Sequence, residues 1–208
     1  MQTIKLTNAF IQNGYSMVGP MEGKGPLGKY FDYVFKDDTL KEKSFEKAER
    51  KLLKNIVTGA IDKAGLKNSD IDFFFGGDLL NQIVSSSYTA RELEIPFVGV
   101  YSACASMTES LGLASIFVDK KIANNVVAGT CSHFSSAERQ YRFPLELGNQ
   151  RPPTAQWTVT GGGATIVSNK PSKIKVSAVT FGKVVDFGIN DVNNMGAAMA
   201  PAIDIIGP

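Results

Sequence analysis

Cysteine, histidine and long apolar runs are scarce in this sequence. It has two cysteines and one histidine in 208 residues. Two distant cysteines do not form a disulfide framework, so we expect both thiols to be reduced. No run of about 20 apolar residues could span a bilayer, and the N-terminus lacks the apolar core of a signal peptide. We therefore expect a cytoplasmic protein that is neither secreted nor integral to a membrane by its own sequence.

The sequence also lacks a large excess of charge of either sign. The 22 lysines and arginines are interspersed with 20 aspartates and glutamates, and the net charge of +2 argues against an electrostatic grip on nucleic acid. The chain is 43% hydrophobic and 20% charged, which is enough apolar material for a single globular domain over residues 1–208. The sequence contains no internal repeat and no low-complexity tract.

Strand and helix patterns alternate along the chain. A helix is predicted over 45–64, because Ser44 can cap it, apolar residues recur at helical spacing and Gly65 is a typical stop. The other predicted segments are strands at 3–12, 71–75, 97–101, 125–131, 158–160, 164–168 and about 173–181, and helices reaching Leu93 and running from about Cys104 to Lys120. This order predicts the α/β class.

Two glycine-rich segments interrupt the pattern. Residues 14–28 lack the spacing and the Lys-Ser/Thr ending of a phosphate-binding loop, so we expect an ordered surface or interface loop. The run Gly161-Gly162-Gly163 is predicted to form a tight turn or bulge between two strands. Residues 134–157 are polar, and they form either a solvated loop with ion pairs or a cover that offers Arg139 or Arg142 to an anion.

Cys104 follows the strand at 97–101 in a turn of small residues. Met107, Leu111, Ala114 and Val118 recur behind it at helical spacing, so the thiol is expected at or beside a helix N-terminus. The unpaired N–H groups there favour an anion and would lower the pKa of a thiol. The alternative is that Cys104 is a small buried packing residue.

Polar residues follow two other predicted strands. Asp78 and Asn81 come after the strand at 71–75, and His133, the single histidine, comes after the strand at 125–131. The C-terminal ends of strands in an α/β sheet face the ligand crevice, so these residues are candidates for one site with Cys104. The alternatives are that Asp78 caps the helix that follows and that His133 is a structural group.

Several motifs carry a family resemblance over nearly the whole chain, up to about Pro201. The chain resembles the N-terminal half of the thiolase and β-ketoacyl synthase fold and, more closely, the thiolase-like family of stage V sporulation AD proteins. The residues that carry the resemblance are Gly25-Pro26-Leu27-Gly28, Ala48-Glu49-Arg50-Lys51-Leu52, Gly77-Asp78-Leu79-Leu80-Asn81-Gln82, Ala103-Cys104-Ala105-Ser106-Met107, Ser132-His133, Ala137-Glu138-Arg139-Gln140, Thr158-Val159-Thr160-Gly161 and Met195-Gly196.

The resemblance implies a fold and a function. It implies the N-terminal αβα half of a five-layered αβαβα architecture, without the C-terminal half. The family is tied to the loading of dipicolinic acid, a small dicarboxylate, into the spore, as a soluble component of a channel complex with membrane subunits, peripheral to the forespore membrane. By position, Cys104 matches the thiolase nucleophile, and Asp78, Asn81 and His133 stand at the pocket mouth.

A dicarboxylate pocket needs a helix N-terminus, charged donors and a slot for the ring. The Cys104 turn, a protonated His133, Arg139 and Tyr101 are the predicted contributors. Asp78 would repel a dianion, so we expect it to orient His133 or Asn81, or to contact a calcium ion carried with the ligand. We expect no cofactor and no metal site of the protein's own.

Two other functions remain open from the sequence. One is an acyl-transfer or condensing enzyme of the thiolase class, with Cys104 as nucleophile and a partner half supplied from elsewhere; without that half, catalysis by this chain alone is not expected. The other is a scaffold for membrane subunits that binds no small molecule. A helix starting near Gly196 would be buried between the two halves of the fold, so we expect self-association or a homo-oligomer, or poor stability.

Overall fold

The computed structural model describes residues 2–141, 158–191, 194, 196–197 and 199–200. Its main sheet has the strand order β3-β2-β7-β6-β4-β5, with β8 also paired to β2. The strands are β2 (Phe10–Val18), β3 (Tyr33–Val34), β4 (Phe73–Gly77), β5 (Phe97–Gly99), β6 (Asn125–Ser132), β7 (Gly161–Ser168) and β8 (Ile174–Lys175). A separate antiparallel ribbon pairs β1 (Gln2–Lys5) with β9 (Ala178–Phe181).

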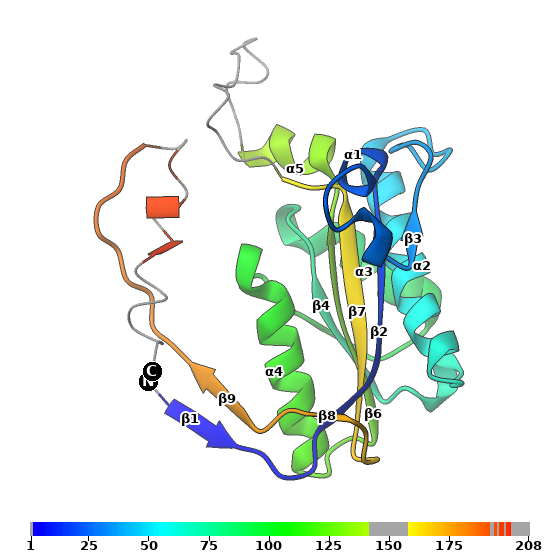
Figure 1. Ribbon diagram of the computed structural model, residues 1–208, viewed down its shortest axis with the longest axis vertical. Coiled ribbons are helices and arrows are strands. Elements are labelled where there is room, and N and C mark those ends of the chain that lie inside the picture. Colours follow the sequence, from blue (N-terminus) through cyan, green and yellow to red (C-terminus); the bar gives the residue numbers. More distant parts are fainter. Residues whose placement is uncertain (1, 142–157, 192–193, 195, 198, 201–208) are drawn as a thin grey trace.

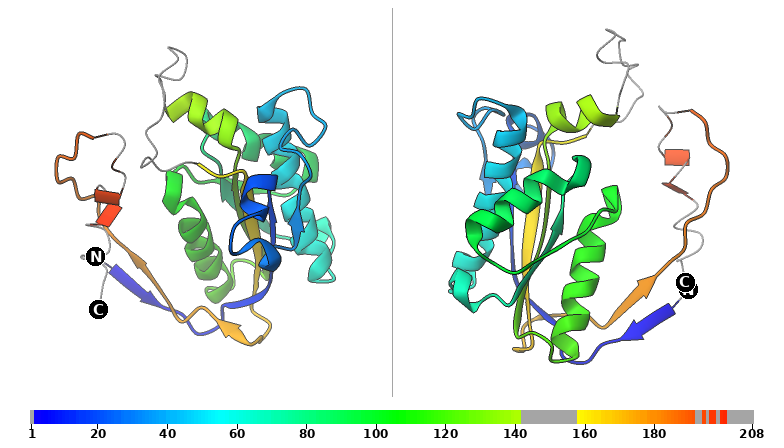
Figure 2. Two further views of the ribbon diagram at one scale, coloured as in Figure 1. Left: turned by 45° about the horizontal axis from the view of Figure 1, so that its top comes forward. Right: turned by 180° about the vertical axis from the view of Figure 1, so that it is seen from behind.

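Helices cover both faces of this sheet, which confirms the predicted αβα layering (Figure 1, Figure 2). The helices are α1 (Pro20–Gly23), α2 (Phe45–Lys63), α3 (Val84–Leu93), α4 (Ser106–Asp119) and α5 (Phe134–Tyr141). Four short 3-10 turns are η1 (Gly28–Tyr30), η2 (Asn68–Asp70), η3 (Asn81–Ile83) and η4 (Ala103–Ala105). Among the described residues, no helix is both long and apolar enough to cross a membrane.

The strand directions determine where the loops lie. β4 pairs in parallel with β5 on one side and with β6 on the other, whereas β6–β7 and β7–β2 are antiparallel. The C-terminal ends of β4, β5 and β6 therefore share one edge of the sheet, as the sequence predicts. The segments that follow these strands carry Asp78, Cys104 and His133.

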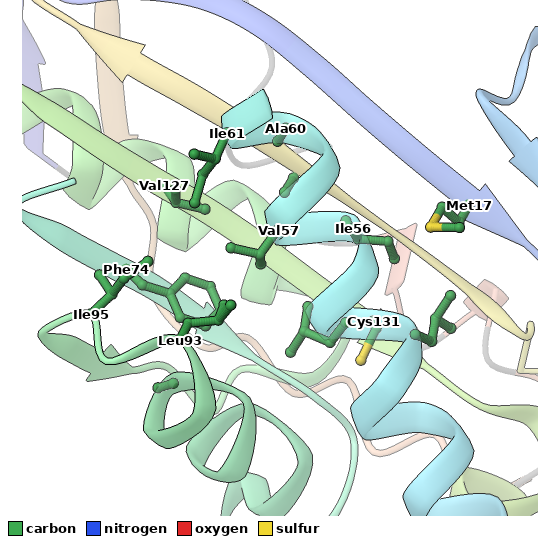
Figure 3. Packing of buried hydrophobic residues seen from close by; sticks show 14 of the residues in the cluster. Met17, Ile56, Val57, Ala60, Ile61, Phe74, Leu93, Ile95, Val127 and Cys131 are labelled. Carbon is green, nitrogen blue, oxygen red and sulfur yellow. The ribbon is translucent and has the colours of Figure 1, made fainter. Parts of the chain in front are cut away.

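Helix α2 forms the larger core by packing its apolar stripe onto the sheet (Figure 3). Leu52, Leu53 and Ile56 are completely buried, and each such side chain contributes roughly 1.5–3 kcal/mol by leaving water. The predicted cap is confirmed, since the Lys47 N–H donates to Ser44 Oγ at 3.3 Å. The predicted stop is confirmed too, because Gly65 has a left-handed φ of 69°.

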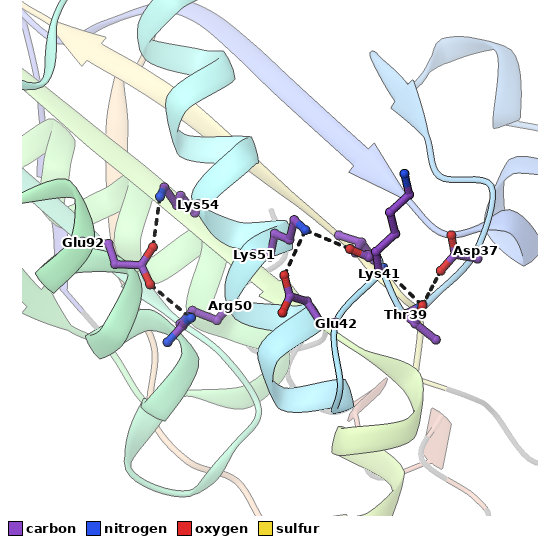
Figure 4. A network of polar contacts seen from close by, with 9 residues as sticks. Asp37, Thr39, Lys41, Glu42, Arg50, Lys51, Lys54 and Glu92 are labelled. Carbon is purple, nitrogen blue, oxygen red and sulfur yellow. Dashed lines mark hydrogen bonds and ion pairs between the residues drawn. The ribbon is translucent and has the colours of Figure 1, made fainter.

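Polar contacts fix the outer face of α2 to its neighbours (Figure 4). Glu92 of α3 pairs with Arg50 at 3.1 Å and with Lys54 at 3.0 Å. Lys51 pairs with Glu42 at 2.9 Å and donates to the carbonyl of Leu40. These contacts hold α3 and the segment before α2 against one helix.

The second core lies on the opposite face, beneath α4. Ala114 and Val118 of α4 are completely buried against Phe75 and Val126 of the sheet. Strand β9 also packs on α4, and Val179 reaches so close to Gly112 that a Cβ there would lie 2.9 Å from the valine. The ribbon is thus attached to the body of the protein through a small residue of α4.

Several predictions of secondary structure need correction. Residues 158–160, predicted as a strand, do not form one, and the strand predicted at about 173–181 divides into β8 and β9. The first strand divides into β1 and β2, and β2 continues through Gly14 to Val18. Residues 161–163 form no turn but belong to β7. Glycine is needed in this strand because a Cβ on Gly162 would lie 2.5 Å from the Thr130 carbonyl oxygen and 2.8 Å from Ile56. The start of the polar segment 134–157 is helix α5, not a loop; residues 142–157 lie outside the described part, as does Ala198 of the predicted last helix.

Asp119, at the end of α4, should stabilise the turn between β1 and β2. Its Oδ1 accepts the N–H groups of Thr7 at 2.6 Å and Asn8 at 2.8 Å. Burial opposes ionisation, but these N–H groups and Lys120 outweigh it and hold the pKa of Asp119 at about 2. Asp119→Asn should lower the free energy of unfolding by about 1–3 kcal/mol at pH 7, measured by urea denaturation.

The same pKa fixes the pH dependence of that loss. The folded-state pKa lies below the ordinary value of 3.8, so the carboxylate stabilises the fold above about pH 4 and the benefit fades toward pH 2. The difference between Asp119→Asn and the parent protein should shrink over this range. Asp62→Asn, at an exposed position of α2, is the control. Equal unfolding curves for Asp119→Asn and the parent at pH 7 would contradict the assignment.

Candidate functional site

The candidate site is the edge of the sheet where β4, β5 and β6 end. The loop after β5 lies directly against the end of β4: a Cβ on Gly77 would be 2.1 Å from the Val100 carbonyl oxygen. The Val100 N–H also donates to the carbonyl of Gly76 at 2.9 Å. A side chain at Gly77 would therefore push the Cys104 loop away from β4.

Cys104 lies in η4, immediately before the first residues of α4, and is exposed. The predicted position at a helix start is confirmed, and the buried-packing alternative is not. The loop is held by bonds from Ser102, whose N–H donates to Ser106 Oγ at 3.2 Å and whose Oγ donates to Glu109. Ala103 has a left-handed φ of 45°, a strained conformation of the kind that gathers at functional sites.

Asp78 is buried, and its carboxylate is fully engaged. Oδ1 accepts the Leu80 N–H at 2.9 Å, and Oδ2 accepts both the N–H and the Oγ–H of Ser86 at 2.7 Å. Since Ser86 is the third residue of α3, Asp78 caps the start of that helix, which was the alternative from sequence. Burial raises its pKa, against these hydrogen bonds. Asp78 therefore supports the loop after β4 from inside and is not exposed at this edge of the sheet.

His133 is completely buried and uses both ring nitrogens. Nδ1 accepts the Ser135 N–H at 3.1 Å, so the ring proton lies on Nε2, which is 2.7 Å from the carbonyl oxygen of Asp38. Phe45 packs on the ring with centroids 5.0 Å apart. The imidazole thus fastens the segment before α2, and a protonated, ligand-facing His133 would have to give up the bond from Ser135.

Asn81 is exposed in η3, between β4 and α3. Its N–H donates to Gln140 Oε1 of α5 at 2.8 Å. The next two residues, Gln82 and Ile83, have left-handed φ values of 60° and 46°, which is unusual for a β-branched residue. Ile83 reaches β5, because a Cβ on Gly99 would lie 2.2 Å from its Cδ1. Strained backbone therefore occurs both at η3, after β4, and at η4, after β5.

Arg139 projects elsewhere. Its Nη1 pairs with Glu46 Oε1 of α2 at 3.0 Å, and half of the side chain is exposed. Both residues line a shallow depression of about 280 Å³ over the start of α2, together with Thr39, Glu42, Lys43, Ser44 and Phe45. This ion pair agrees with the solvated alternative for the start of the polar segment. Arg142 and Glu146 lie outside the described residues.

A buried acid that the sequence analysis did not single out lies on α2, against Cys131 of β6 and Ser136 of α5. Glu49 of α2 is completely buried, and its Oε2 accepts the Ser136 hydroxyl at 2.5 Å. The Cys131 thiol lies 3.9 Å from Oε1. Burial raises the pKa of Glu49 to about 8, the Ser136 hydrogen bond opposes this, and the charge of Asp78 adds to it. Burial also raises the pKa of the Cys131 thiol. The sequence did carry a sign that Glu49 is buried, because it lies on the apolar stripe of the helix, one residue after Ala48 and three before Leu52.

The structure thus brings three strand ends together but separates their side chains by role. Cys104 and Asn81 are exposed in the loops at this edge, whereas Asp78 and His133 are buried. In the part of the chain that the structure describes, no group of three acidic, histidine or cysteine side chains could hold a metal ion. The predicted contact of Asp78 with a calcium ion would require its carboxylate to leave three hydrogen bonds.

Comparison with known proteins gives both a family and a fold. Residues 1–207 match the sequence profile of the family described as stage V sporulation protein AD. The stage V sporulation protein AD of Bacillus subtilis (strain 168) is 45% identical over 193 residues, which are 93% of this chain and 57% of that protein. The chain therefore spans little more than half the length of this relative.

Solved structures with the same fold are much more distant in sequence. A variant of OleA from Xanthomonas campestris has a TM-score of 0.54 at 12% identity, over 79% of this chain and 59% of that one. The 3-oxoacyl-[acyl-carrier-protein] synthase III of Aquifex aeolicus has a TM-score of 0.52 at 15% identity, over 79% and 55%. These similarities show a thiolase-like fold and nothing about chemistry.

Glu49 should make the fold less stable as pH rises. Its folded-state pKa of about 8 exceeds the ordinary value of 4.5, so between these values the folded state holds a proton that the unfolded state has lost. Between pH 5.5 and 7.5 the parent protein should lose about 2 kcal/mol of unfolding free energy relative to Glu49→Gln, which keeps an acceptor for Ser136. Urea denaturation at the two pH values measures this difference.

The control for this experiment is Glu46→Gln. Glu46 lies one turn earlier on α2 in an exposed ion pair, and such pairs contribute about 0–1 kcal/mol. Its pH dependence should follow that of the parent protein. If Glu49→Gln also follows the parent between pH 5.5 and 7.5, Glu49 is not held protonated in the folded state.

Proposed function

Because the chain belongs to the stage V sporulation protein AD family and has a thiolase-like fold, we propose that it binds dipicolinic acid in a crevice at the edge of the sheet where β4, β5 and β6 end. The observation that carries the proposal is the exposed Cys104 turn at the start of α4. The positive dipole end of a 14-residue helix lies there, which suits a carboxylate.

The position of Asp78 favours a dianionic ligand. An exposed carboxylate at the crevice would repel dipicolinate, but Asp78 is buried, accepts three hydrogen bonds and has a raised pKa. Its carboxylate is therefore directed into the start of α3 and away from solvent. Exposed groups at this edge include the Cys104 turn, the Asn81 amide and the ring of Tyr101, which is 57% exposed. They offer polar contacts and an aromatic face for the pyridine ring. The Glu109 carboxylate, in the first turn of α4, accepts the Ser102 hydroxyl.

The same geometry favours binding over condensation. A thiolase-type reaction needs a base that can take a proton near the nucleophilic thiol. The single histidine of the sequence is buried, with its nitrogens bonded to Asp38 and Ser135. In the proposed site Cys104 therefore contacts ligand and does not act as a nucleophile. This chain matches only 57% of the longer relative. Any activity that needs the rest of that protein is therefore a proposal for this chain.

We extend the proposal to the setting of the protein. Uptake of dipicolinic acid into the spore requires a membrane channel, and we propose that this protein acts as a peripheral component that passes ligand to its membrane subunits. Arg139 is a secondary candidate contact, since it would first have to release Glu46. A calcium ion, if needed, would arrive with the ligand. Self-association remains a proposal, supported by exposed apolar side chains such as Val184 and Phe187.

Calorimetric titration with dipicolinate tests the site. Cys104→Ala and Asn81→Ala should each weaken binding roughly tenfold, because each removes a polar contact at the strand-end edge. Asn169→Ala is a matched amide control beyond the far end of β7, and Tyr88→Ala on α3 matches a Tyr101→Ala variant. Titration with and without calcium shows whether the ion is required. Parent-like affinity in all three crevice variants would refute the site, and no binding by the parent protein would favour the scaffold function.

Mass spectrometry after incubation with acetyl-coenzyme A tests the acyl-transfer alternative, which the exposed thiol of Cys104 makes worth measuring. We expect no acetyl adduct on the parent protein, because the imidazole is committed to Asp38 and Ser135. Cys104→Ala is the control for any adduct found elsewhere. A stoichiometric acetyl group on Cys104 would contradict a binding-only role and favour the enzyme.

A further inference from the structure

A compact segment at one edge of the sheet exposes several large apolar side chains. We define the 20–34 surface as the exposed side chains of α1, η1, β3 and their connections: Met21 (76% exposed), Leu27 (60%), Tyr30 (70%), Tyr33 (47%) and Val34 (37%), with exposed Lys24 and Lys29. The 20–34 surface includes β3, which is the edge strand on the side of the sheet opposite β5. It is therefore separated from the start of α4 by the width of the sheet (Figure 1).

This segment is well ordered by its own packing. Gly23 contacts Val34 so closely that a Cβ would lie 2.2 Å from it, and a Cβ on Gly28 would lie 2.0 Å from the Gly23 carbonyl oxygen. The Tyr30 N–H donates to the Leu27 carbonyl at 2.9 Å. The two glycines bring α1, η1 and β3 together and leave no space inside for larger side chains. The apolar side chains are therefore exposed by a folded structure and not by a loose loop.

The two acidic side chains of the segment are bonded to other elements, whereas its two lysines are exposed. Glu22 turns inward, where its Oε1 accepts the Thr160 N–H at 2.9 Å. Asp32 pairs with Lys63 at 2.8 Å and accepts the Ser16 N–H at 2.9 Å. Both acids are thus engaged with other elements. The two lysines are exposed, and the Lys29 ammonium lies 5.0 Å from the centre of the Tyr30 ring.

We infer that the 20–34 surface binds the headgroup region of an anionic lipid bilayer. Tyrosines and lysines next to Met and Leu match that environment, since aromatic rings sit at the headgroup level, apolar side chains reach the acyl boundary and ammonium groups meet anionic lipid. Two lysines and a few apolar side chains give weak, reversible and salt-dependent attachment. The inference rests on the proposed peripheral location and names the face that would contact the membrane.

Co-sedimentation with vesicles tests it. The intact chain should bind vesicles of phosphatidylglycerol and phosphatidylcholine more strongly than vesicles of phosphatidylcholine alone, and about 0.5 M salt should release most of it. Lys24→Gln/Lys29→Gln should lower the partition coefficient roughly tenfold, and Met21→Ser/Leu27→Ser should lower it by about the same factor. The dipicolinate titration is independent of this result, so either proposal can fail alone.

The segment Lys173-Ile174-Lys175 offers matched controls, because all three side chains are exposed at β8. Lys173→Gln/Lys175→Gln and Ile174→Ser should leave vesicle binding unchanged. Circular dichroism of each variant confirms its fold. Equal binding to anionic and neutral vesicles, equal losses in the β8 controls, or no binding at all would overturn the inference. Sedimentation velocity completes the test: a dimer that is lost in Met21→Ser/Leu27→Ser would show that the surface meets a second copy instead.

Discussion

The parallel pairing of β4 with both β5 and β6 is the constraint on which the rest of the structure depends. Phe74 of β4 lies opposite Phe97 of β5 and Val127 of β6, and Gly76 opposite Gly99 and Gly129. The glycine level allows close contact, since a Cβ on Gly76 would lie 2.4 Å from the Gly129 carbonyl oxygen. Because the three strands run the same way, three loops must gather at one edge.

Gathering loops at one edge creates a demand for hydrogen bonds. Buried backbone groups in such loops need partners, and side chains from the loops supply them. Asp78 takes the N–H groups at the start of α3, and His133 bridges Ser135 and Asp38. Once these side chains hold the frame, they are no longer available at the opening. The thiol of Cys104 remains exposed, and its neighbours in η4 are two alanines, whose side chains are too small to cover it.

The sequence predicted those features of the fold that depend on interactions between residues close together in the chain. Ser44 and Gly65 set the ends of α2 through contacts within a few residues, and the strand ends followed from apolar runs bounded by turn formers. The glycine run of β7 was predicted wrongly, because its need for glycine comes from Ile56 on a distant helix. The orientation of His133 depends on the Asp38 carbonyl, 95 residues away, and no periodicity could reveal it. Burial of Glu49 had a local signal in its place on the apolar stripe.

The division between frame and opening has a chemical consequence for the proposed function. The carboxyl group of Glu49 and the imidazole of His133 lie inside, where each is tied to a partner from another segment. A ligand at the opening would meet a thiol, an amide, a phenol and the start of α4, which hold an anion without accepting its proton. Affinity would then follow the shape and charge of the ligand. On the proposed function, a thiolase-like fold would keep a cysteine at the start of α4 and use the groups around it to bind a small dicarboxylate.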